Sequence, residues 1–474
     1  MSLAEYSLTI GGEAVVTADS LDVINPATEA VIGHAPNATA KELDDAVAAA
    51  RRAFPGWRDL PRTERARSLK AAAAVLVEHA DSLMRLLTSE QGKPHDEARF
   101  EIMGAAYWLT SFADMEIPVT VNEDTDERLS ETRRVPVGVV AGISPWNFPV
   151  LLSFWKIAPA LAAGNSLVLK PSPFTPLTML RIGELLRGVF PPGVLNVIVG
   201  DDALGPLMTA HPGFDKISFT GSTATGKRVM ASAATDLKRI TLELGGNDAA
   251  IVMPDVDIEQ TGKALFWAAF RNSGQICIAT KRLYVHADIY EPLTRALVDY
   301  ARSVRLGDGA GQGTQLGPVQ NALQFARVAE LIDDSKAQGH DFLLGGDIDR
   351  DVPGYFIPVT IIGNPPEASR IVQEEPFGPV LPILKFDNLE DAIARANASD
   401  YGLAGSVWTK DIALATEVAQ RLETGTVWIN EVQHLTPFQP FAGHKQSGIG
   451  VENGLSGLLE YTISQTVTVK HIVA

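Results

Sequence analysis

The sequence predicts an α/β protein with more than one domain, built on doubly wound parallel sheets. From residue 137 to 246, short apolar runs alternate with helical candidates, and the same alternation resumes after residue 246. Short buried strands separated by helices are typical of parallel sheets. A chain of 474 residues also exceeds the size at which one hydrophobic core keeps growing, so two or three domains are expected.

Composition narrows the possible partners. The chain is 46% hydrophobic and 20% charged, as folded globular proteins are, and its formal net charge is -17. That charge repels phosphate backbones and anionic lipid, so we expect neither a nucleic-acid nor a membrane partner. The most apolar region, 137–169, is interrupted by Asn147, Pro149, Lys156 and Pro159. It therefore predicts a buried strand and helix rather than a membrane span.

The chain has one cysteine, Cys277. A single cysteine cannot form an intrachain disulfide or a Cys-based zinc site, and this usage is typical of a reducing compartment. The first residues lack the basic and apolar regions of a signal peptide. We therefore expect a cytoplasmic protein, and we assign no metal ligands.

The N-terminal part predicts a short arm followed by helices. Residues 1–33 alternate apolar and polar side chains around turns at Gly11-Gly12 and Asn25-Pro26, which favours a short β-ribbon arm. A capping box of Thr39 and Glu42 opens the next helix. Further helices are predicted over 63–79 and 96–115.

Two extended segments lie far apart in the sequence. Residues 118–136 have no helical apolar stripe, and residues 462–474 include an alternating Thr-Val run. Paired together they would form a flap suited to dimer formation, although a solvated hairpin fits the composition equally well.

The two α/β regions provide the predicted sheets. In the first we expect strands at 138–143, 167–169, 195–199, 217–219 and 240–244. In the second we expect helices near 257–270, 289–304 and 320–337, and strands at 283–285, 380–386, 404–408 and 427–430. Ligands of such sheets bind at the carboxyl ends of the strands.

Three polar residues lie at turns or strand ends, where a catalytic side chain would be expected. Cys277 follows Asn272-Ser273-Gly274-Gln275, which predicts a turn that presents the thiol, although a lone cysteine is more often a small buried hydrophobe. Glu243 ends an apolar strand, where desolvation would raise its pKa and suit it to general-base work. Asn147, between two prolines and two aromatic residues, could donate to an oxyanion, or it could be an ordinary turn asparagine.

The segment Phe219 to Arg228 leads from a strand through glycines into a helix, a typical place for a phosphate. Its spacing is close to that of a P-loop. Arg228, however, occupies the position of the magnesium-binding hydroxyl, so the signal for a nucleotide triphosphate is weak. Glycines needed only for close packing explain the segment equally well.

Seven motifs follow one another in order along the chain. They are Pro145-Trp146-Asn147-Phe148-Pro149, Lys170-Pro171-Ser172, Phe219-Thr220-Gly221-Ser222-Thr223, Leu242-Glu243-Leu244-Gly245-Gly246, Gly274-Gln275-Ile276-Cys277, Glu374-Glu375-Pro376-Phe377-Gly378-Pro379 and Pro440-Phe441-Ala442-Gly443-His444-Lys445. In this order they resemble the aldehyde dehydrogenase superfamily, of the NAD(P)-dependent, non-acylating type, over essentially the full chain.

The resemblance implies a fold in three parts. These are a Rossmann-like NAD(P)-binding domain (1–117 and 137–245), a second α/β catalytic domain (246–461) and a small β oligomerisation flap (118–136 and 462–474). It also implies a homodimer or homotetramer.

The resemblance implies a role for each polar residue. Cys277 would attack the aldehyde to give a thiohemiacetal and then a thioester. Asn147 and the Cys277 backbone N–H would form the oxyanion hole, and Glu243 would be the base. Lys156 and Glu452 resemble a lysine and a glutamate of a proton relay.

The cofactor residues implied by the resemblance are Ile143, Trp146, Lys170, Ser172, Gly221, Ser222, Gly226, Leu244, Glu375 and Phe377. Pro173 stands where relatives often carry a glutamate that holds the adenosine ribose. Losing that carboxylate reduces the repulsion of a 2′-phosphate, so NADP is possible. NAD is still the preferred prediction.

By the same resemblance, the substrate channel would be lined by Phe148, Leu151, Trp155, Ile276, Ile278 and Phe441. This apolar set favours uncharged aliphatic or aromatic aldehydes, because no arginine is clearly placed to bind a distal carboxylate. The alternatives within the superfamily are a CoA-acylating and a semialdehyde-specific dehydrogenase. A different class, a nucleotide-hydrolysing protein using Gly221 to Lys227, is disfavoured by Arg228.

Overall fold

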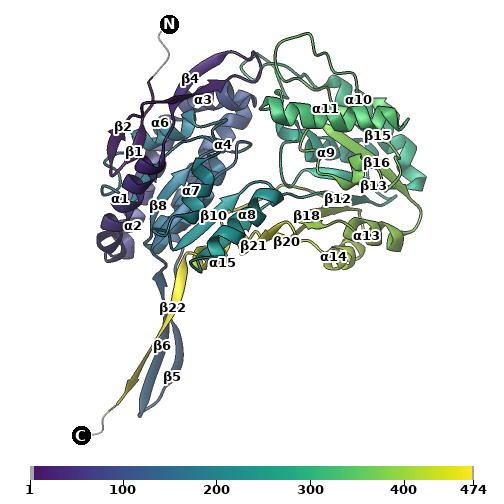
Figure 1. Ribbon diagram of the computed structural model, residues 1–474. Coiled ribbons are helices and arrows are strands. Elements are labelled where there is room, and N and C mark those ends of the chain that lie inside the picture. The colour runs from purple at the N-terminus through teal and green to yellow at the C-terminus, as the bar shows by residue number, and fades with distance from the viewer. Residues whose placement is uncertain (1–4, 472–474) are drawn as a thin grey trace.

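The computed structural model describes residues 5–471 and contains two α/β bodies and a projecting three-stranded sheet. In Figure 1 the first body is drawn in purple and teal, and the second body is mostly green. The narrow sheet extends away from the first body and carries the C-terminal strand, in yellow.

The first body is organised around an eight-stranded sheet with the order β2-β1-β9-β8-β7-β10-β11-β21. Its five central strands, from β9 to β11, pair in parallel, which confirms the predicted sheet. The strands are β1 (Leu8–Ile10), β2 (Glu13–Val15), β7 (Val139–Ile143), β8 (Ser166–Lys170), β9 (Leu195–Val197), β10 (Lys216–Thr220), β11 (Arg239–Glu243) and β21 (Gly448–Ile449).

Helices pack around this sheet. The predicted capping box opens the first of them: the Glu42 carboxylate accepts from the Thr39 backbone N–H at 2.8 Å. Helix α5 is apolar on nearly every side and is buried beyond its first residue, because it runs through the middle of the body. The helices are α1 (Ala40–Arg58), α2 (Arg62–Glu78), α3 (Ala80–Gln91), α4 (His95–Asp114), α5 (Leu151–Ala163), α6 (Leu177–Leu185), α7 (Leu204–Ala210) and α8 (Thr223–Ala234).

The second body holds a seven-stranded sheet with the order β14-β15-β16-β13-β12-β18-β19. Only the pairing of β14 with β15 is antiparallel. Its strands are β12 (Asp248–Val252), β13 (Thr280–His286), β14 (Asp341–Leu344), β15 (Thr360–Gly363), β16 (Val380–Phe386), β18 (Ala404–Trp408) and β19 (Thr426–Ile429). Its helices are α9 (Ile258–Phe270), α10 (Tyr290–Ser303), α11 (Ala322–Ala337), α12 (Arg370–Gln373), α13 (Leu389–Asn397) and α14 (Ile412–Arg421), with the short helix η2 (Ala287–Ile289).

The predicted pairing of the two extended segments is confirmed. Strand β6 (Arg128–Pro136) pairs with β5 (Thr120–Asp124) on one side and with β22 (Thr462–Lys470) on the other, both antiparallel. We call this three-stranded sheet the flap. Residues 472–474 of the predicted segment lie outside the described residues.

The expected N-terminal ribbon is confirmed only for residues 20–36, where two strands pair as a separate sheet, and residues 1–4 lie outside the described residues. The first strands do not form a separate arm, because β1 pairs with β9 and extends the main sheet. Burial explains the pairing, since Leu8 and Ile10 are covered by the first core. The remaining short elements are β3 (Ser20–Ile24) paired with β4 (Val31–Pro36), β17 (Tyr401–Gly402) paired with β20 (His444–Lys445), and α15 (Gly454–Leu459).

No helix between residues 5 and 471 combines the length and apolar character needed to cross a bilayer. The division of the chain into domains at 117/118, 136/137, 245/246 and 461/462 stays a prediction.

Strand β21 comes from the C-terminal part of the chain, within the predicted catalytic domain, but it pairs with β11 of the first sheet.

Candidate active site

Cys277 follows a strained turn at the end of α9. The turn is the short 3₁₀ helix η1 (Arg271–Gly274). Within it, Asn272 and Ser273 have φ angles of 49° and 55°. Non-glycine residues in such conformations cost roughly 1–3 kcal/mol each unless their surroundings hold them. Here Asn272 Nδ2 donates to the Asn147 carbonyl oxygen at 3.1 Å, and Ser273 Oγ donates to a backbone carbonyl at 2.6 Å. The predicted turn therefore exists, and its polar side chains hold it.

Gly274 and Gln275 carry the chain from this turn to the thiol. Gly274 has a φ of 73°, and a Cβ there would lie 2.2 Å from the carbonyl oxygen of Gly378, so only glycine fits. The Gln275 side chain is buried, and its Nε2 donates to the Asn272 carbonyl oxygen at 2.9 Å. These contacts fix the backbone that presents Cys277.

A cavity of about 310 Å³ opens beside the thiol, and we call it the tunnel. It brings together three predicted catalytic residues (Cys277, Glu243 and Asn147) and all six predicted channel residues (Phe148, Leu151, Trp155, Ile276, Ile278 and Phe441). Much of its wall is aromatic. Trp155 stacks on Trp108 with ring centroids 5.7 Å apart and meets Phe441 edge-on at 5.5 Å.

Asn147 is buried in the tunnel wall with its amide beside the nucleophile's loop. Its Nδ2 donates to the Gln275 carbonyl oxygen at 2.9 Å. An amide nitrogen has two protons, so this bond leaves one for a ligand in the tunnel.

Glu243 lies at the carboxyl end of β11, where its side chain lines the tunnel. It is 4% exposed, and neither of its carboxylate oxygens has a hydrogen-bond partner within residues 5–471. Burial, together with the nearby Glu452 carboxylate, raises the pKa of Glu243 well above its usual value, and Lys156 opposes this shift. A desolvated carboxyl of this kind is suited to act as a base near neutral pH.

Burial also raises the pKa of the Cys277 thiol, to about 12. The nearby ammonium of Lys281 opposes this shift, and the carboxylates of Glu375, Asp248 and Glu243 add to it. The thiol therefore needs a base to become a nucleophile.

Lys156 and Glu452 lie behind the tunnel wall. Both side chains are fully buried, and Lys156 Nζ lies 3.0 Å from a Glu452 carboxylate oxygen. Lys156 Nζ also donates to the hydroxyl of Thr220 at 2.8 Å. Thr220 lines the tunnel, so the Thr220 side chain connects the buried Lys156–Glu452 pair to the tunnel wall.

A second cavity, of about 730 Å³, lies at the carboxyl ends of the first sheet's strands. We call it the cofactor cavity, and six of the predicted cofactor residues line it: Ile143, Trp146, Lys170, Ser172, Gly221 and Ser222. Thr220 lines both cavities, so they meet there. Helix α8 starts at this cavity with Ser222 as its N-cap, and the Ser222 side chain accepts from the backbone N–H of Thr225.

The other four predicted cofactor residues lie around this region. A Cβ at Gly226 would lie 2.4 Å from a methyl of Leu244, so these two residues pack directly together. Phe377 meets Trp146 edge-on, with centroids 5.3 Å apart. A carboxylate oxygen of Glu375 accepts from the backbone N–H of Gly246 at 3.2 Å.

Comparison with known proteins identifies the family to which this chain belongs. The sequence matches the model of the Aldehyde dehydrogenase family over residues 15–467. The chain belongs to the aldehyde dehydrogenase family. A probable aldehyde dehydrogenase from Pseudomonas sp. is 44% identical over 470 residues, which cover 99% of this chain and 96% of that protein.

Two solved aldehyde dehydrogenase structures share the fold. An NAD+ complex of aldehyde dehydrogenase from Bacillus cereus has a TM-score of 0.96 at 38% identity, with 98% of this chain and 97% of that chain covered. Betaine aldehyde dehydrogenase from Staphylococcus aureus, in complex with NAD+, has a TM-score of 0.94 at 38% identity, with 98% and 94% covered. The family, fold class and enzyme class predicted from the sequence are therefore confirmed.

In this aldehyde dehydrogenase, sequence reasoning missed the charged residues of the tunnel wall. Asp96, Glu97 and Arg271 line it together with Phe100 and Gly104. In the sequence, no arginine is clearly placed to bind a distal carboxylate. The structure puts Arg271 in the wall, together with the acidic side chains of Asp96 and Glu97. A readable signal existed, because residues 97, 100, 104 and 108 recur at helical spacing on α4.

Sequence reasoning also missed the residues that hold the catalytic loops. Lys281 Nζ donates to the Cys277 carbonyl oxygen at 2.5 Å and lies 3.2 Å from a Glu375 oxygen. Lys227, part of the P-loop-like segment, donates instead to the Gln446 side chain at 2.8 Å. That contact gives Lys227 a structural role and further disfavours a nucleotide-hydrolysing protein.

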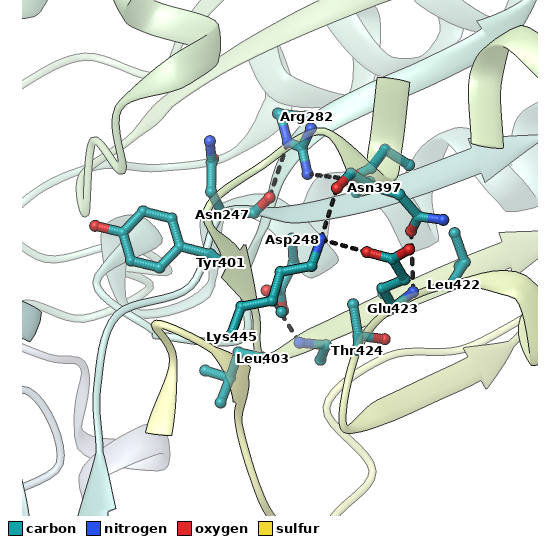
Figure 2. A pocket seen from close by; sticks show the side chains of 15 residues that line it. Asn247, Asp248, Arg282, Asn397, Tyr401, Leu403, Leu422, Glu423, Thr424 and Lys445 are labelled. Atoms are coloured by element: carbon teal, nitrogen blue, oxygen red, sulfur yellow. Dashed lines mark hydrogen bonds and ion pairs between the residues drawn. The ribbon is translucent and has the colours of Figure 1, made fainter. Parts of the chain in front are cut away.

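A third, much smaller cavity lies behind the catalytic loops of the enzyme (Figure 2). Its volume is about 10 Å³, which admits roughly one water molecule and no aldehyde. Figure 2 shows Lys445 extended across it toward Glu423, an ion pair of 2.7 Å. Asp248 accepts from the backbone N–H of Ala404 at 3.2 Å, and burial raises its pKa to about 7. The residues around this cavity therefore have a structural role and do not bind the substrate.

Proposed function

We propose that the chain oxidises an aldehyde to the carboxylic acid through a thiohemiacetal and a thioester on Cys277, with NAD as the hydride acceptor. One observation carries the proposal. The tunnel places Cys277, Glu243 and Asn147 on one apolar cavity, and this cavity meets the cofactor cavity at Thr220.

The cofactor cavity suits a dinucleotide. Gly221 and Gly226 allow the start of α8 to pack closely beside the cavity, because a Cβ at either would lie within 2.6 Å of Phe219 or Leu244. The N-terminus of α8 offers backbone N–H groups and a positive dipole end to a pyrophosphate. The ten cofactor residues named above would hold NAD there, and its nicotinamide would supply the acceptor for the hydride.

The chain's own residues perform the remaining steps. As the Cys277 sulfur bonds to the carbonyl carbon, its S–H bond breaks and Glu243 takes the proton. The Asn147 amide and the Cys277 backbone N–H stabilise the negative oxygen, and one such donor is typically worth roughly 3–4 kcal/mol. After the thioester forms, Glu243 gives up the thiol's proton and then takes one from the attacking water. The C–S bond breaks, the acid leaves, and the Cys277 thiolate regains a proton from Glu243.

Cys277→Ala tests the proposal. With hexanal and NAD, the variant should form no reduced nicotinamide, while its NAD affinity by calorimetry should match that of the wild type. Cys277 lines the tunnel and not the cofactor cavity, so cofactor binding is expected to survive. Turnover by Cys277→Ala at the wild-type rate would overturn the mechanism. Acid formation by the wild type without CoA would exclude the acylating alternative.

NAD is preferred over NADP in this proposal because the cavity holds a carboxylate. Asp202 lines it beside Pro173, Lys170 and Ser172. Burial lowers the pKa of Lys170 to about 8, and the carboxylates of Asp202 and Asp201 partly oppose this shift. A weakened cation facing acidic side chains is a poor site for a 2′-phosphate.

The proposed substrate is an uncharged aliphatic or aromatic aldehyde. The tunnel is mostly apolar and aromatic, and Asp96 and Glu97 outnumber Arg271 in its wall. An anionic semialdehyde would meet the Asp96 carboxylate there, and burial raises the pKa of the neighbouring Glu97. The expected result is a higher kcat/KM for hexanal or benzaldehyde than for succinic semialdehyde, and the reverse order would refute this preference.

A second substrate class is favoured by the same wall. Quaternary ammonium groups bind aromatic faces through cation–π attraction, and carboxylates add to it. The relative from Staphylococcus aureus is named for betaine aldehyde. Including betaine aldehyde in the kinetic panel separates the two classes.

The proposal includes a homodimer or homotetramer assembled through the flap, in the cytoplasm. Val121 on β5 and Val469 on β22 are exposed, at 55% and 50%, on the two edge strands of that sheet. Exposed edges carrying apolar side chains favour association. Light scattering of the intact chain and of Val469→Asp tests the assembly, which should weaken in the variant.

A further inference from the structure

The proposed reaction produces protons beside a buried base. Aldehyde, water and NAD+ become the acid, NADH and one proton, and the acid releases a second proton when it ionises. The first proton is collected by Glu243, which is 4% exposed and shares the tunnel with mostly apolar side chains. Glu243 must lose that proton before it can accept another from the attacking water, so an outlet is needed. The inference below rests on the proposed function.

Strand β10 carries an unusual pattern for a strand in the middle of a core. Its residues alternate as Lys216, Ile217, Ser218, Phe219 and Thr220. Ile217 and Phe219 belong to the first core, and Lys216 and Ser218 are buried although they are polar. Successive side chains of a strand point to opposite faces, so the three polar side chains form one row.

The neighbouring strand β11 adds a second polar row on the same face. The two strands are parallel and in register, and Thr220 lies opposite Glu243, Ser218 opposite Thr241, and Lys216 opposite Arg239. Directly opposed residues of paired strands point to the same face. The rows start at the catalytic base and run back along the strands for about 13 Å, at about 3.3 Å per residue.

Hydrogen bonds join the first half of this path. Lys156 Nζ donates to the Thr220 hydroxyl at 2.8 Å and lies 3.0 Å from Glu452 Oε1. The Ser218 hydroxyl donates to the same Glu452 oxygen at 3.0 Å. The other Glu452 oxygen, Oε2, is buried with no partner among the residues described, so it is free to accept a proton.

Lys216 lies two residues before Ser218 on the same face of β10 and extends the polar row toward the surface. Its side chain is fully buried, and its Nζ donates to the Thr241 hydroxyl at 2.6 Å and lies 3.6 Å from a Glu460 oxygen. Glu460 is 33% exposed, and it lines a solvent-open cavity together with Arg239 and Arg134. The path therefore ends at solvent, far from both the tunnel and the cofactor cavity.

We propose that Lys156, Glu452, Ser218, Lys216 and Glu460 form a proton outlet that carries the proton of Glu243 through the first sheet to the cavity beside the flap. At each step one O–H or N–H bond breaks and another forms, and no electrons are transferred. Lys156 passes a proton to Glu452 and takes a replacement proton from Glu243. Glu452 passes its proton through the Ser218 hydroxyl to neutral Lys216, and Lys216 passes it to Glu460, which releases it to solvent. Lys156 and Glu452 are the two residues already placed in a relay, and Ser218, Lys216 and Glu460 are added by this geometry.

The electrostatics suit such transfers. Burial lowers the pKa of Lys216 to about 8, while Glu460 and Glu452 oppose the shift, so this lysine can gain and lose a proton near neutral pH. The charged and titratable groups facing the path are Lys156 from α5, Glu243 and Arg239 from β11, Glu452, Glu460 and Tyr461 from the segments flanking α15, and Arg134 from β6.

Glu460→Gln is the main test, because it keeps the side chain's shape at a partly exposed position. In dilute buffer at pH 7 its steady-state rate should fall by about 10-fold or more, as expected when a proton-transfer group is lost. The first-turnover burst of NADH should keep its amplitude, because Glu243 can still accept one proton. Imidazole, which can reach the solvent-open cavity, should restore the rate.

Glu367→Gln is the matched control, since Glu367 has a similar side-chain exposure of 31% and lies in the second body. It should show the wild-type rate with or without imidazole. Lys216→Arg separates proton transfer from simple charge pairing, because a guanidinium keeps the charge and cannot be deprotonated in a protein. A Lys216→Arg variant that folds and turns over like the wild type would overturn the proposal.

A Glu460→Gln variant would also overturn the proposal if its rate and its solvent deuterium isotope effect equalled those of the wild type in dilute buffer. Failure of the proposed function would look different. In that case the wild type would form no NADH from aldehydes, and Cys277→Ala would change nothing.

Discussion

Lys93 Nζ donates to the backbone carbonyl oxygen of Asn147 at 2.9 Å, and both side chains are buried. Lys93 also pairs with Glu101 at 2.5 Å, and Glu101 accepts from two backbone N–H groups at the start of α5. The Lys93 ammonium lies 3.7 Å from the ring centroid of Phe148. A buried ion pair therefore holds the loop that aims the Asn147 amide into the tunnel.

Lys93→Met should damage both stability and catalysis. It leaves the Glu101 carboxylate buried without its cation, and breaking a buried pair in this way costs about 3–5 kcal/mol. Asn147 would also lose the contact that fixes its backbone, so kcat should fall by up to about 100-fold, the loss typical of a missing oxyanion donor. Urea unfolding and steady-state kinetics measure the two effects.

Lys70→Met is the control for Lys93→Met. Lys70 pairs with Asp114, but the two side chains are 49% and 67% exposed, so the pair should contribute little to stability. Equal effects of the two substitutions would show that burial of the Lys93 pair is unimportant.

Gly274→Ala should impair catalysis more than stability alone explains. The φ of 73° strains any other residue, and the added Cβ would lie 2.2 Å from the Gly378 carbonyl oxygen, which forces the turn before Cys277 to move. Gly339→Ala is a matched control, because Gly339 has a φ of 71° and a Cβ there would meet open space. Both variants share a backbone cost of roughly 1–2 kcal/mol. Only Gly274→Ala should lose kcat, so equal kcat values would contradict the positioning role.

Local sequence patterns predicted much of both sheets and marked the central site residues as candidates, for a physical reason. Glu243 and Cys277 are polar residues placed directly after an apolar strand and a polar turn, so both were visible without tertiary contacts. Strand β12 was missed although five apolar residues, 249–253, precede Pro254 and although it is an interior strand of its sheet. Its neighbours in space, β13 and β18, come from distant parts of the chain.

The support of the site depends on contacts that no local pattern contains. Lys93 and Asn147 are 54 residues apart, and Lys216 and Glu460 are 244 residues apart. Each of these lysines looks like an ordinary surface residue in sequence. The alternation of Lys216, Ser218 and Thr220 can be recognised in the sequence as a polar row of period two. That this row faces Glu452 could be known only from the fold.

Pro173→Glu should sharpen the cofactor preference. Pro173 lines the cofactor cavity beside Lys170 and Ser172. A carboxylate there would repel a 2′-phosphate and could accept hydrogen bonds from a ribose. The ratio of kcat/KM for NAD to that for NADP should therefore rise by about 10-fold, or about 1.4 kcal/mol. Asp202→Asn, which removes a carboxylate from the same cavity, should move the ratio in the opposite direction.

The pH dependence of turnover should follow Glu243. Because burial raises the pKa of this carboxyl well above 4.5, it holds its proton at pH values where ordinary glutamates are ionised. The hydrolytic rate should therefore rise with pH along a limb that lies well above pH 4.5, measured after the NADH burst. In Glu452→Gln that limb should move to lower pH, since a carboxylate that raises the pKa of Glu243 is gone. A limb unchanged in Glu452→Gln would exclude Glu243 as the titrating group.

The same shift predicts an effect of Glu243 on folding stability. Its folded pKa lies above the unfolded value, so between the two the folded state binds more protons, and stability falls as pH rises. Glu243→Gln removes this cost. The variant should therefore unfold at higher urea than the wild type at pH 8, and the difference should vanish near pH 4, where both forms carry a neutral side chain. Equal midpoints at pH 8 would mean that the carboxylate finds a compensating partner in solution.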